Sequence, residues 1–494
     1  MLFTTATFAF LYLPIVLVGF FVWGRRSPAA AALWLFAASV FFYGYWMPVF
    51  TLLLLGSIAT NFLIGQRILH AEAQAARRAW LVAGLVANLG ALAYFKYANF
   101  FVANVVAAFG LDWRMARVIL PIGISFYTFT QIAYLVDTWQ GKVRETRPLH
   151  YGLFVTYFPH LIAGPVLHHA QMMPQFGNAQ VYRFHAGHFS AGMAIFCIGL
   201  VKKVVLADGI APYADAVFSP VDRAGAHAGL AEAWIGALAY TFQLYFDFSG
   251  YSDMAIGLSW MFNIRLPFNF DSPYKALSIS DFWRRWHITL SNFLRDYLYL
   301  ALGGNRKGRV RRYLNLGITM VLGGLWHGAD WSFIVWGALH GGYLMVNHGF
   351  RAAVQYLGWQ APHAVRPVLR AGAWLLTFLC VVVAWVLFRA ESLAGALRML
   401  QSMVGHVPAN TDPGLLLWNA GLQPTVALAW FGVLGALALL APNSNRIGTR
   451  VLGWMEAMPS WRAPLAGAAV AAAVLLVLVN TLRSGVSAFI YFNF

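Results

Sequence analysis

The sequence is poor in charged residues. Only 10% of its 494 residues are Asp, Glu, Lys or Arg, whereas 60% are apolar. Soluble domains carry about 25% charged residues, and a soluble chain of this length needs far more charge to cover its surface. The deficit excludes a soluble or disordered protein and predicts an integral membrane protein.

Cysteine is nearly absent, since Cys197 and Cys380 are the only two. This excludes a disulfide-stabilised secreted scaffold, and both thiols lie in apolar runs, where we expect them to be buried and inert. The first 24 residues also lack the basic segment of a cleavable signal peptide, because Arg25 and Arg26 follow the apolar run. We therefore expect the first helix to remain in the protein, with its N-terminus outside.

Familiar motifs of soluble enzymes are absent too. The sequence contains no Walker loop, no Gly-x-Ser-x-Gly elbow and no dinucleotide fingerprint. His168 and His169 have no further ligand at metal-binding spacing. We therefore expect no metal site and no tightly bound cofactor.

Long uncharged runs dominate what is present. About 20 apolar residues cross a bilayer as a helix, and runs of roughly that length predict an all-α, polytopic membrane protein with about 11–12 transmembrane helices in one domain, 1–494. The runs are Thr4–Gly24, Ala29–Trp46, Val49–Gly65, Ala79–Phe95, Val118–Val136, His188–Val201, Ala233–Phe246, Tyr313–Leu325, Ser332–Val346, Ala371–Phe388, Thr425–Ala441 and Ala463–Leu482.

The net charge of +17 orients these helices. In a soluble protein it would suggest nucleic acid, but here the basic residues concentrate in short connections, which is typical of cytoplasmic loops. Placing loops such as Arg306–Arg312 in the cytoplasm leaves the Met47–Pro48 turn and the C-terminal tail, 485–494, in the periplasm. We expect no nucleic-acid partner.

The middle of the chain is less regular. Leu149–Val201 and Asp247–Arg312 are apolar but interrupted by Pro, Gly, His and charged residues, a pattern that favours re-entrant or interfacial helices. Irregular backbone at membrane depth must be buried in protein or line a wet cavity. We therefore expect the functional site in this part of the chain.

Three polar clusters interrupt the apolar background. In Tyr245–Asp253, the carboxylates of Asp247 and Asp253 are costly in lipid and should line a substrate cavity or form a structural knot. In Ser280–Ser291, a helix capped by Ser280 would place Arg284, His287 and Ser291 on one face, where they would form a polar wall that binds substrate. The alternative for this cluster is an interfacial helix with a structural histidine.

The third cluster, Leu322–Asp330, contains His327 between Trp326 and Gly328. Glycine allows close approach of a backbone or a ligand, so we favour a functional His327 over a core histidine. His340, in the following segment, is interpreted as structural.

These segments resemble the membrane-bound O-acyltransferase (MBOAT) family. The motifs are Pro159–Pro165, Tyr245–Gly257, Leu266–Tyr274, Asp281–Leu302 and Leu325–Gly328, and the resemblance is strongest over 120–342, the expected catalytic core. It implies a multi-helix bundle with a cytoplasmic donor entrance. The family's invariant histidine maps onto His327, and its second catalytic position, which is Asn, Asp or His in different branches, maps onto His287.

The nearest branch of the family O-acetylates alginate. The resemblance thus implies an acetyltransferase of the bacterial inner membrane that moves acetyl groups from cytoplasmic acetyl-CoA towards an exported polysaccharide, with a periplasmic SGNH-type acetyltransferase or esterase and a polysaccharide biosynthesis complex as partners. The identity of the polymer stays open. A transporter or flippase, and a non-catalytic scaffold of a secretion complex, are the alternatives.

Within this reading, His327 is the general base and His287 holds the thioester carbonyl or its oxyanion. Arg284, Arg285 and the loop Arg306–Arg312 would attract the phosphates of CoA, unless the loop serves only topology.

The chain ends in Phe489-Ile-Tyr-Phe-Asn-Phe494. This ending resembles the C-terminal motif of the companion peptide in teichoic-acid D-alanylation, whose tyrosine accepts the acyl group. We expect Tyr491 to be either such an acyl carrier or a residue of the interfacial aromatic belt.

Overall fold

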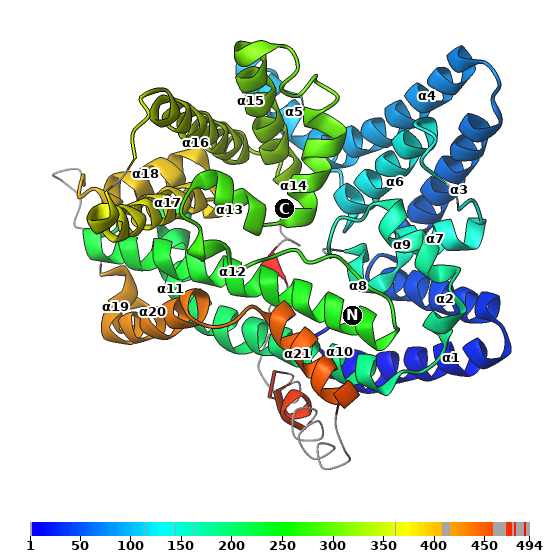
Figure 1. Cartoon of the computed structure of the whole chain (residues 1–494). Helices are drawn as coiled ribbons and strands as arrows, with labels where there is room; N and C mark the ends of the chain where they lie inside the picture. Colours follow the sequence, from blue (N-terminus) through cyan, green and yellow to red (C-terminus); the bar gives the residue numbers. More distant parts are fainter. Residues whose placement is uncertain are drawn as a thin grey trace. The chain divides into compact units, whose positions relative to one another are not determined.

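A computed structural model describes residues 2–113, 115–143, 145–162, 164–360, 362–407, 415–457, 471–476, 479–480 and 489–490. These residues are mainly helical, and no β-strand occurs among them (Figure 1), which confirms the all-α class. They form two compact units, the first within Met1–Val201, Gly250–Phe268 and Ser444–Asn493, the second within Lys202–Ser249 and Asn269–Asn443. Because these segments interleave, the expectation of one domain stays a prediction.

The first unit is built from the N-terminal helices. Its members are η1 (Thr7–Tyr12), α1 (Leu13–Arg26), α2 (Pro28–Trp46), α3 (Pro48–His70), α4 (Gln74–Leu92), η2 (Ala93–Tyr97), α5 (Ala98–Phe109), α6 (Ile124–Trp139), α7 (Pro148–Thr156), α8 (Phe158–Leu161), α9 (His169–Phe176), η3 (Ala179–Tyr182), α10 (Ala186–Val201) and α21 (Ser444–Ala457). Within it, α3, α4 and α6 pack against one another.

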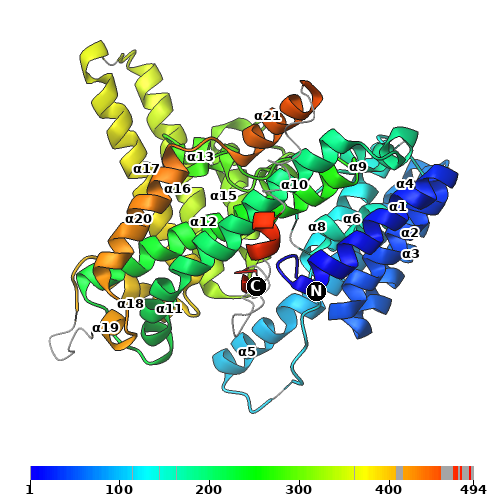
Figure 2. The ribbon, with the colours of Figure 1, turned by 90° about the horizontal axis from the view of Figure 1, so that it is seen from below.

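The second unit holds most of the remaining helices. Its members are η4 (Lys202–Ala207), α11 (Asp208–Arg223), η5 (Pro273–Lys275), α13 (Ile279–Arg285), α14 (Ile288–Phe293), η6 (Leu294–Tyr299), α15 (Gly308–His327), α16 (Trp331–Tyr356), η7 (His363–Val365), α17 (Arg366–Arg389), α18 (Leu393–Met403), α19 (Leu416–Asn419) and α20 (Pro424–Leu439). Helices α16 and α17 lie side by side (Figure 2). One further helix, α12 (Leu230–Met261), contributes residues to both units.

Six helical stretches are long and apolar enough to cross a membrane in the described part of the chain, or seven if one bent pair counts as a span. This supports a multi-pass protein but is fewer than the expected eleven or twelve. Several uncharged runs belong to helices such as α12, α15 and α16, whose polar residues lower their hydropathy. The last expected run, Ala463–Leu482, lies mostly outside the described residues.

The irregular middle is confirmed only in part. Residues 148–182 form the short elements α7, α8, α9 and η3, as the broken pattern predicts. The segment after Asp247 does not break at once, because α12 continues to Met261 as one helix of 32 residues. Short helices return only at η5, α13 and α14.

The outer faces of α3 and α4 carry large apolar side chains. Val49 and Leu52 on α3, and Val86 on α4, are 65–78% exposed. Apolar side chains this open to the surroundings are stable in hydrocarbon rather than water. These helices therefore present a lipid-facing surface.

Candidate active site

The site is built on the close pairing of α15 and α16. A Cβ atom at Gly324 would collide with the carbonyl oxygen of Phe333, and one at Gly337 would collide with that of Met320. Small residues allow helices to approach this closely inside membranes. The two glycines thus fix the end of α15, where His327 lies, against α16.

His327 is the last residue of α15, and its side chain is buried. Its ring contacts the rings of Trp336 and Phe388 edge-on, with centroid distances of 5.1 and 5.2 Å. Aromatic walls exclude water and so strengthen electrostatic interactions inside the site. The position agrees with a functional imidazole at the end of an apolar helix.

His287 lies between two short helices rather than within one. Helix α13 ends at Arg285 and α14 starts at Ile288, while His287 adopts the left-handed conformation with φ 44°. The expected continuous helix is therefore wrong, and Arg284, His287 and Ser291 do not share a helix face. Ser278, rather than Ser280, caps α13 by accepting a hydrogen bond from the Asp281 amide.

Asn269 fixes this break. Its side-chain oxygen accepts hydrogen bonds from the Thr289 hydroxyl at 2.9 Å and the Thr289 amide at 3.3 Å, and lies 3.1 Å from His287 Nδ1. Because an amide oxygen only accepts, Nδ1 of His287 must carry the proton, so the neutral ring keeps the lone pair on Nε2. We did not identify Asn269 from the sequence, although a lone Asn between two Phe residues signals a buried amide with assigned partners.

The two imidazoles lie close together. The ring centroids of His287 and His327 are 6.4 Å apart, and both residues are at least 96% buried. Phe248 closes the other side of His287 with its ring edge-on at 4.8 Å. Two imidazoles at this separation in an aromatic enclosure suit proton transfer and carbonyl polarisation at one reacting centre.

A third histidine belongs to the same cluster. His340 is fully buried, its ring lies 4.8 Å from that of Trp336, and its Nδ1 accepts a hydrogen bond from the indole N–H of Trp283 at 3.3 Å. The neutral His340 ring therefore carries its proton on Nε2. This arrangement agrees with the structural interpretation of His340 and adds that it orients Trp283.

Trp283, whose ring contacts that of His340, also lines a cavity of about 350 Å³ in the second unit, and His287 and His327 are not among the residues of its lining. The cavity is lined by Trp283, Ser291, Leu294, Arg295, Tyr299, Asn305, Arg312, Leu316, Thr319, Met320, Leu344 and His348. Burial and the charges of Arg312 and Arg351 lower the pKa of His348, which lies beyond the expected span Ser332–Val346. Two guanidinium groups reach the wall, Arg312 and Arg295, and Arg295 is ion-paired with Asp296 at 2.7 Å, so Arg312 is the main attraction for an anionic ligand.

Of the predicted binding residues, Ser291 lines this cavity, whereas Arg284 and Arg285 do not belong to its lining. Arg284 donates to the Ser280 carbonyl, and Arg285 donates to the Asp281 carboxylate at 3.1 Å. These contacts stabilise α13. The cavity instead uses Arg295, on the π-helical turn η6, which the sequence did not single out.

Both predicted carboxylates have protein partners. Asp247 accepts from buried Lys203 at 2.6 Å, and Lys203 also contacts Asp208 at 2.8 Å. In the first unit, Asp253 accepts from the Ser444 hydroxyl at 2.9 Å. Buried charges require such partners, and the contacts support the structural knot among the two alternatives.

Some expectations are not tested by these contacts. Tyr491 lies outside the described residues. The expectation that Cys197 and Cys380 are buried is wrong, because both residues are only partly buried. Among the described residues, no group of three or more His, Cys, Asp or Glu side chains is placed to hold a metal ion.

Comparison with known proteins identifies the family to which the region with both histidines is similar. A family model described as MBOAT, membrane-bound O-acyltransferase family, matches residues 144–388, which include both histidines. The peptidoglycan O-acetyltransferase of Helicobacter pylori is 44% identical over 432 residues, covering 82% of this chain and 80% of that protein. The probable alginate O-acetylase AlgI of Azotobacter vinelandii is 45% identical over 412 residues, covering 82% and 78%.

A more distant relative shares the acyl-transfer chemistry. The teichoic acid D-alanyltransferase of Bacillus subtilis is 29% identical over 237 residues, covering 46% of this chain and 59% of that protein. Relatives named as acyltransferases decide against a transporter or a scaffold. The chain belongs to the membrane-bound O-acyltransferase family, and it is a multi-pass membrane O-acyltransferase.

Proposed function

We propose that this protein transfers an acetyl group from acetyl-CoA to a hydroxyl group, as the first step in O-acetylation of a cell-surface glycan. The observation that supports this most strongly is the buried pair His287 and His327, which lies in the same unit as a cavity whose wall holds Arg295 and Arg312. CoA is polyanionic, and guanidinium groups suit its phosphates. Arg295 and Arg312 therefore replace Arg284 and Arg285 as the proposed donor contacts.

In the proposed reaction, His327 takes the proton from the acceptor hydroxyl as its oxygen attacks the thioester carbonyl carbon. The carbon–sulfur bond then breaks, and the CoA thiolate leaves and takes up the proton. The products are an O-acetyl ester and the CoA thiol. One hydrogen-bond donor aimed at the oxyanion in a dry site contributes about 3 kcal/mol.

His287 is proposed to hold that oxyanion. Since Nδ1 donates to Asn269, the ring donates from Nε2 only when it is charged. A role in carbonyl polarisation therefore requires the imidazolium form, whereas the neutral ring would serve as a second base. Asn269 therefore influences the mechanism, because it determines which ring nitrogen of His287 faces the reacting centre with a proton or a lone pair.

The proposed setting is the bacterial inner membrane, with acetyl-CoA entering from the cytoplasm and the glycan outside. Relatives named for peptidoglycan and for alginate match this chain about equally well, so the polymer is best found in cells. A periplasmic SGNH-type partner and a polysaccharide biosynthesis complex would complete the pathway. No resident cofactor is proposed.

Tyr491 stays the proposed acyl carrier between this site and the periplasmic partner. A phenyl ester is a reactive donor because phenolate, with a parent pKa near 10, leaves more readily than an alkoxide. Tyr491→Phe keeps the ring and removes the nucleophile. Normal polymer acetylation in that variant would leave the tyrosine an interfacial belt residue.

The central test uses purified protein in liposomes with labelled acetyl-CoA and measures release of the CoA thiol and transfer of the labelled acetyl group to the protein, while acetylation of the polymer is measured in cells. His327→Ala should reduce transfer about 10²–10⁴-fold, the typical loss for a positioned base. His70→Ala is the matched control, because His70 is exposed at the end of α3 and its ring nitrogen pairs with the Gln66 carbonyl of its own helix. Transfer by His327→Ala above a tenth of wild type would contradict the general-base role.

A further inference from the structure

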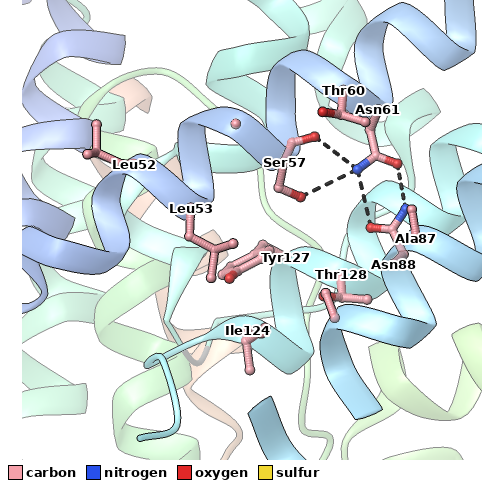
Figure 3. A pocket seen from close by; sticks show the side chains of 12 residues that line it. Leu52, Leu53, Ser57, Thr60, Asn61, Ala87, Asn88, Ile124, Tyr127 and Thr128 are labelled. Atoms are coloured by element: carbon pink, nitrogen blue, oxygen red, sulfur yellow. Dashed lines mark hydrogen bonds between the residues drawn. The ribbon is translucent and has the colours of Figure 1, made fainter. Parts of the chain in front are cut away.

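The first unit contains a second cavity, of about 360 Å³, between α3, α4 and α6. Figure 3 shows Leu52, Leu53, Ser57, Thr60 and Asn61 contributed by one helix, with Tyr127 and Thr128 below them. Gly56, Ala87, Asn88, Ala91 and Ile124 complete the lining. The volume falls within the range of small-molecule sites, about 300–1,000 Å³, and far exceeds what one or two waters need.

The polar part of the lining is uncharged and firmly held. Asn61 donates to the Asn88 side-chain oxygen at 3.2 Å, and Asn88 donates back to Asn61 (Figure 3). The Ser57 hydroxyl accepts from Gln131 at 2.9 Å. Polar residues inside membranes bind helices together in this way, so these groups form a rigid floor that offers dipoles and no net charge.

The hydroxyl of Tyr127 is a buried polar group of the lining that lacks a hydrogen-bond partner in the described part of the chain. Tyr127 is 3% exposed, and its hydroxyl has no hydrogen-bond partner among the residues that the structure describes. A buried hydroxyl without a partner costs about 1–3 kcal/mol. A ligand atom in the cavity would remove that cost.

The cavity opens towards lipid. Leu52, Gly56, Thr60 and Ala87 line it and are exposed on the outer faces of α3 and α4. Both helices belong to stretches that are long and apolar enough to span the membrane. A ligand therefore enters sideways from the bilayer.

The depth of the cavity can be read along the helices. Helix α3 has 23 residues, and Ser57 lies about 14 Å from its start at Pro48. The basic residues Arg67, Arg77 and Arg78 lie near the other end, which the charge rule assigns to the cytoplasm. On that topology, the cavity runs from the outer half of the span to its middle, where Thr60 and Asn61 lie.

We propose that this cavity binds an uncharged outer-leaflet lipid through a hydroxyl or ester group that reaches Tyr127, with its apolar chain along Leu52 and Leu53. The lack of any charged lining residue disfavours fatty acids and phosphate headgroups, because an unpaired charge is costly at this depth. The hydroxyl and amide floor favours a glyceride over a plain hydrocarbon. This site is separate from the proposed catalytic function and does not depend on it.

The test uses the full-length protein in detergent and measures its unfolding temperature with added mono-oleoylglycerol, with oleate, and with 1-octadecene. Gly56→Leu fills the cavity mouth, since a Cβ at Gly56 meets no atom within 4 Å. Gly90→Leu is the matched control on α4, because a Cβ there is equally unobstructed and Gly90 does not line the cavity. Native mass spectrometry counts the glyceride molecules retained.

Mono-oleoylglycerol should raise the unfolding temperature of wild type and Gly90→Leu by about 3 °C or more, with one molecule bound. Gly56→Leu should show neither effect, and Tyr127→Phe should no longer distinguish mono-oleoylglycerol from 1-octadecene. The last comparison keeps the proposal testable if Gly56→Leu is poorly folded. Equal stabilisation of Gly56→Leu, or equal stabilisation of wild type by oleate, would overturn the proposal.

Discussion

The two cavities have nearly equal volumes, about 360 Å³ in the first unit and about 350 Å³ in the second, yet they differ in charge. The first is lined by hydroxyl and amide groups between three spans. The second has Arg312 and Arg295 in its wall, and Arg295 is ion-paired with Asp296. Volume therefore says little about the ligand, and it is on the charge of the lining that we base the two proposals, a neutral lipid for the first cavity and a polyanionic donor for the second.

The topology expected from the charge pattern accounts for this difference. The first cavity lies within spans, where a charge without a partner is costly. The second is lined in part by residues next to the basic loop Arg306–Arg312, near the cytoplasm by the charge rule. Variants in one cavity should consequently leave the function of the other intact.

The largest expected effect comes from the histidine pair. His287→Ala should reduce acetyl transfer about 10²–10⁴-fold, and the double variant with His327→Ala should be little worse than either single one, because residues that serve one step are not additive. Purified variants assayed for CoA thiol release will show this. Losses that multiply would mean that the two rings serve different steps, and stabilisation by mono-oleoylglycerol should persist in all three proteins.

Asn269 should have the next largest effect. Asn269→Ala removes the acceptor that orients His287, and a displaced catalytic group costs about 10²-fold in kcat. Asn269→Asp keeps an acceptor of the same shape and favours the charged ring. If His287 donates to the oxyanion, the Asp variant should keep most of its activity; an Asp variant as impaired as the Ala variant would instead favour a neutral, basic His287.

The arginines of the second cavity should have a smaller effect. Replacing Arg295 and Arg312 together by Gln should raise KM for acetyl-CoA about ten-fold with little change in kcat, and added salt should narrow the difference from wild type. Arg223→Gln is the control, since Arg223 forms an exposed ion pair with Glu391. An unchanged KM would show that acetyl-CoA does not bind in this cavity.

The smallest effect is expected in the first cavity. Thr128→Val replaces one lining hydroxyl by a methyl group of similar size and should lower the stabilisation by mono-oleoylglycerol by about 1–2 °C, since one neutral hydrogen bond contributes about 1 kcal/mol. Acetyl transfer should stay within two-fold of wild type. A ten-fold loss of transfer would show that the two cavities are functionally coupled.

Sequence patterns predicted the helical, membrane-spanning class because composition alone determines it. They also singled out His327 and His287, through glycines, aromatic neighbours and family motifs, and the structure brings the two rings within 6.4 Å of each other, while their catalytic roles stay a prediction. Local patterns could not show that the chain turns at His287, since a helical spacing of polar residues fits 284–291 equally well. The turn depends on Asn269, 18 residues earlier in the chain.

Long-range pairing also explains the other differences. Asp247 looked available for a substrate, but Lys203, 44 residues away, neutralises it. The polar cavity of the first unit escaped notice because Ser57, Asn61, Asn88 and Thr128 are scattered singly in apolar runs. These residues form a recognisable site only once the three helices pack and bring them together.

The backbone at His287 has a consequence for how this site can evolve. With φ at 44°, the position disfavours bulky and β-branched side chains, whereas Asn, Asp and His are the non-glycine residues that adopt this conformation most readily. The family resemblance assigns those same three residues to this position in its different branches. The backbone conformation therefore limits which residues can occupy this position, whatever their chemistry. A substitution must first adopt the left-handed conformation, and only then can its polar group be selected for acyl transfer.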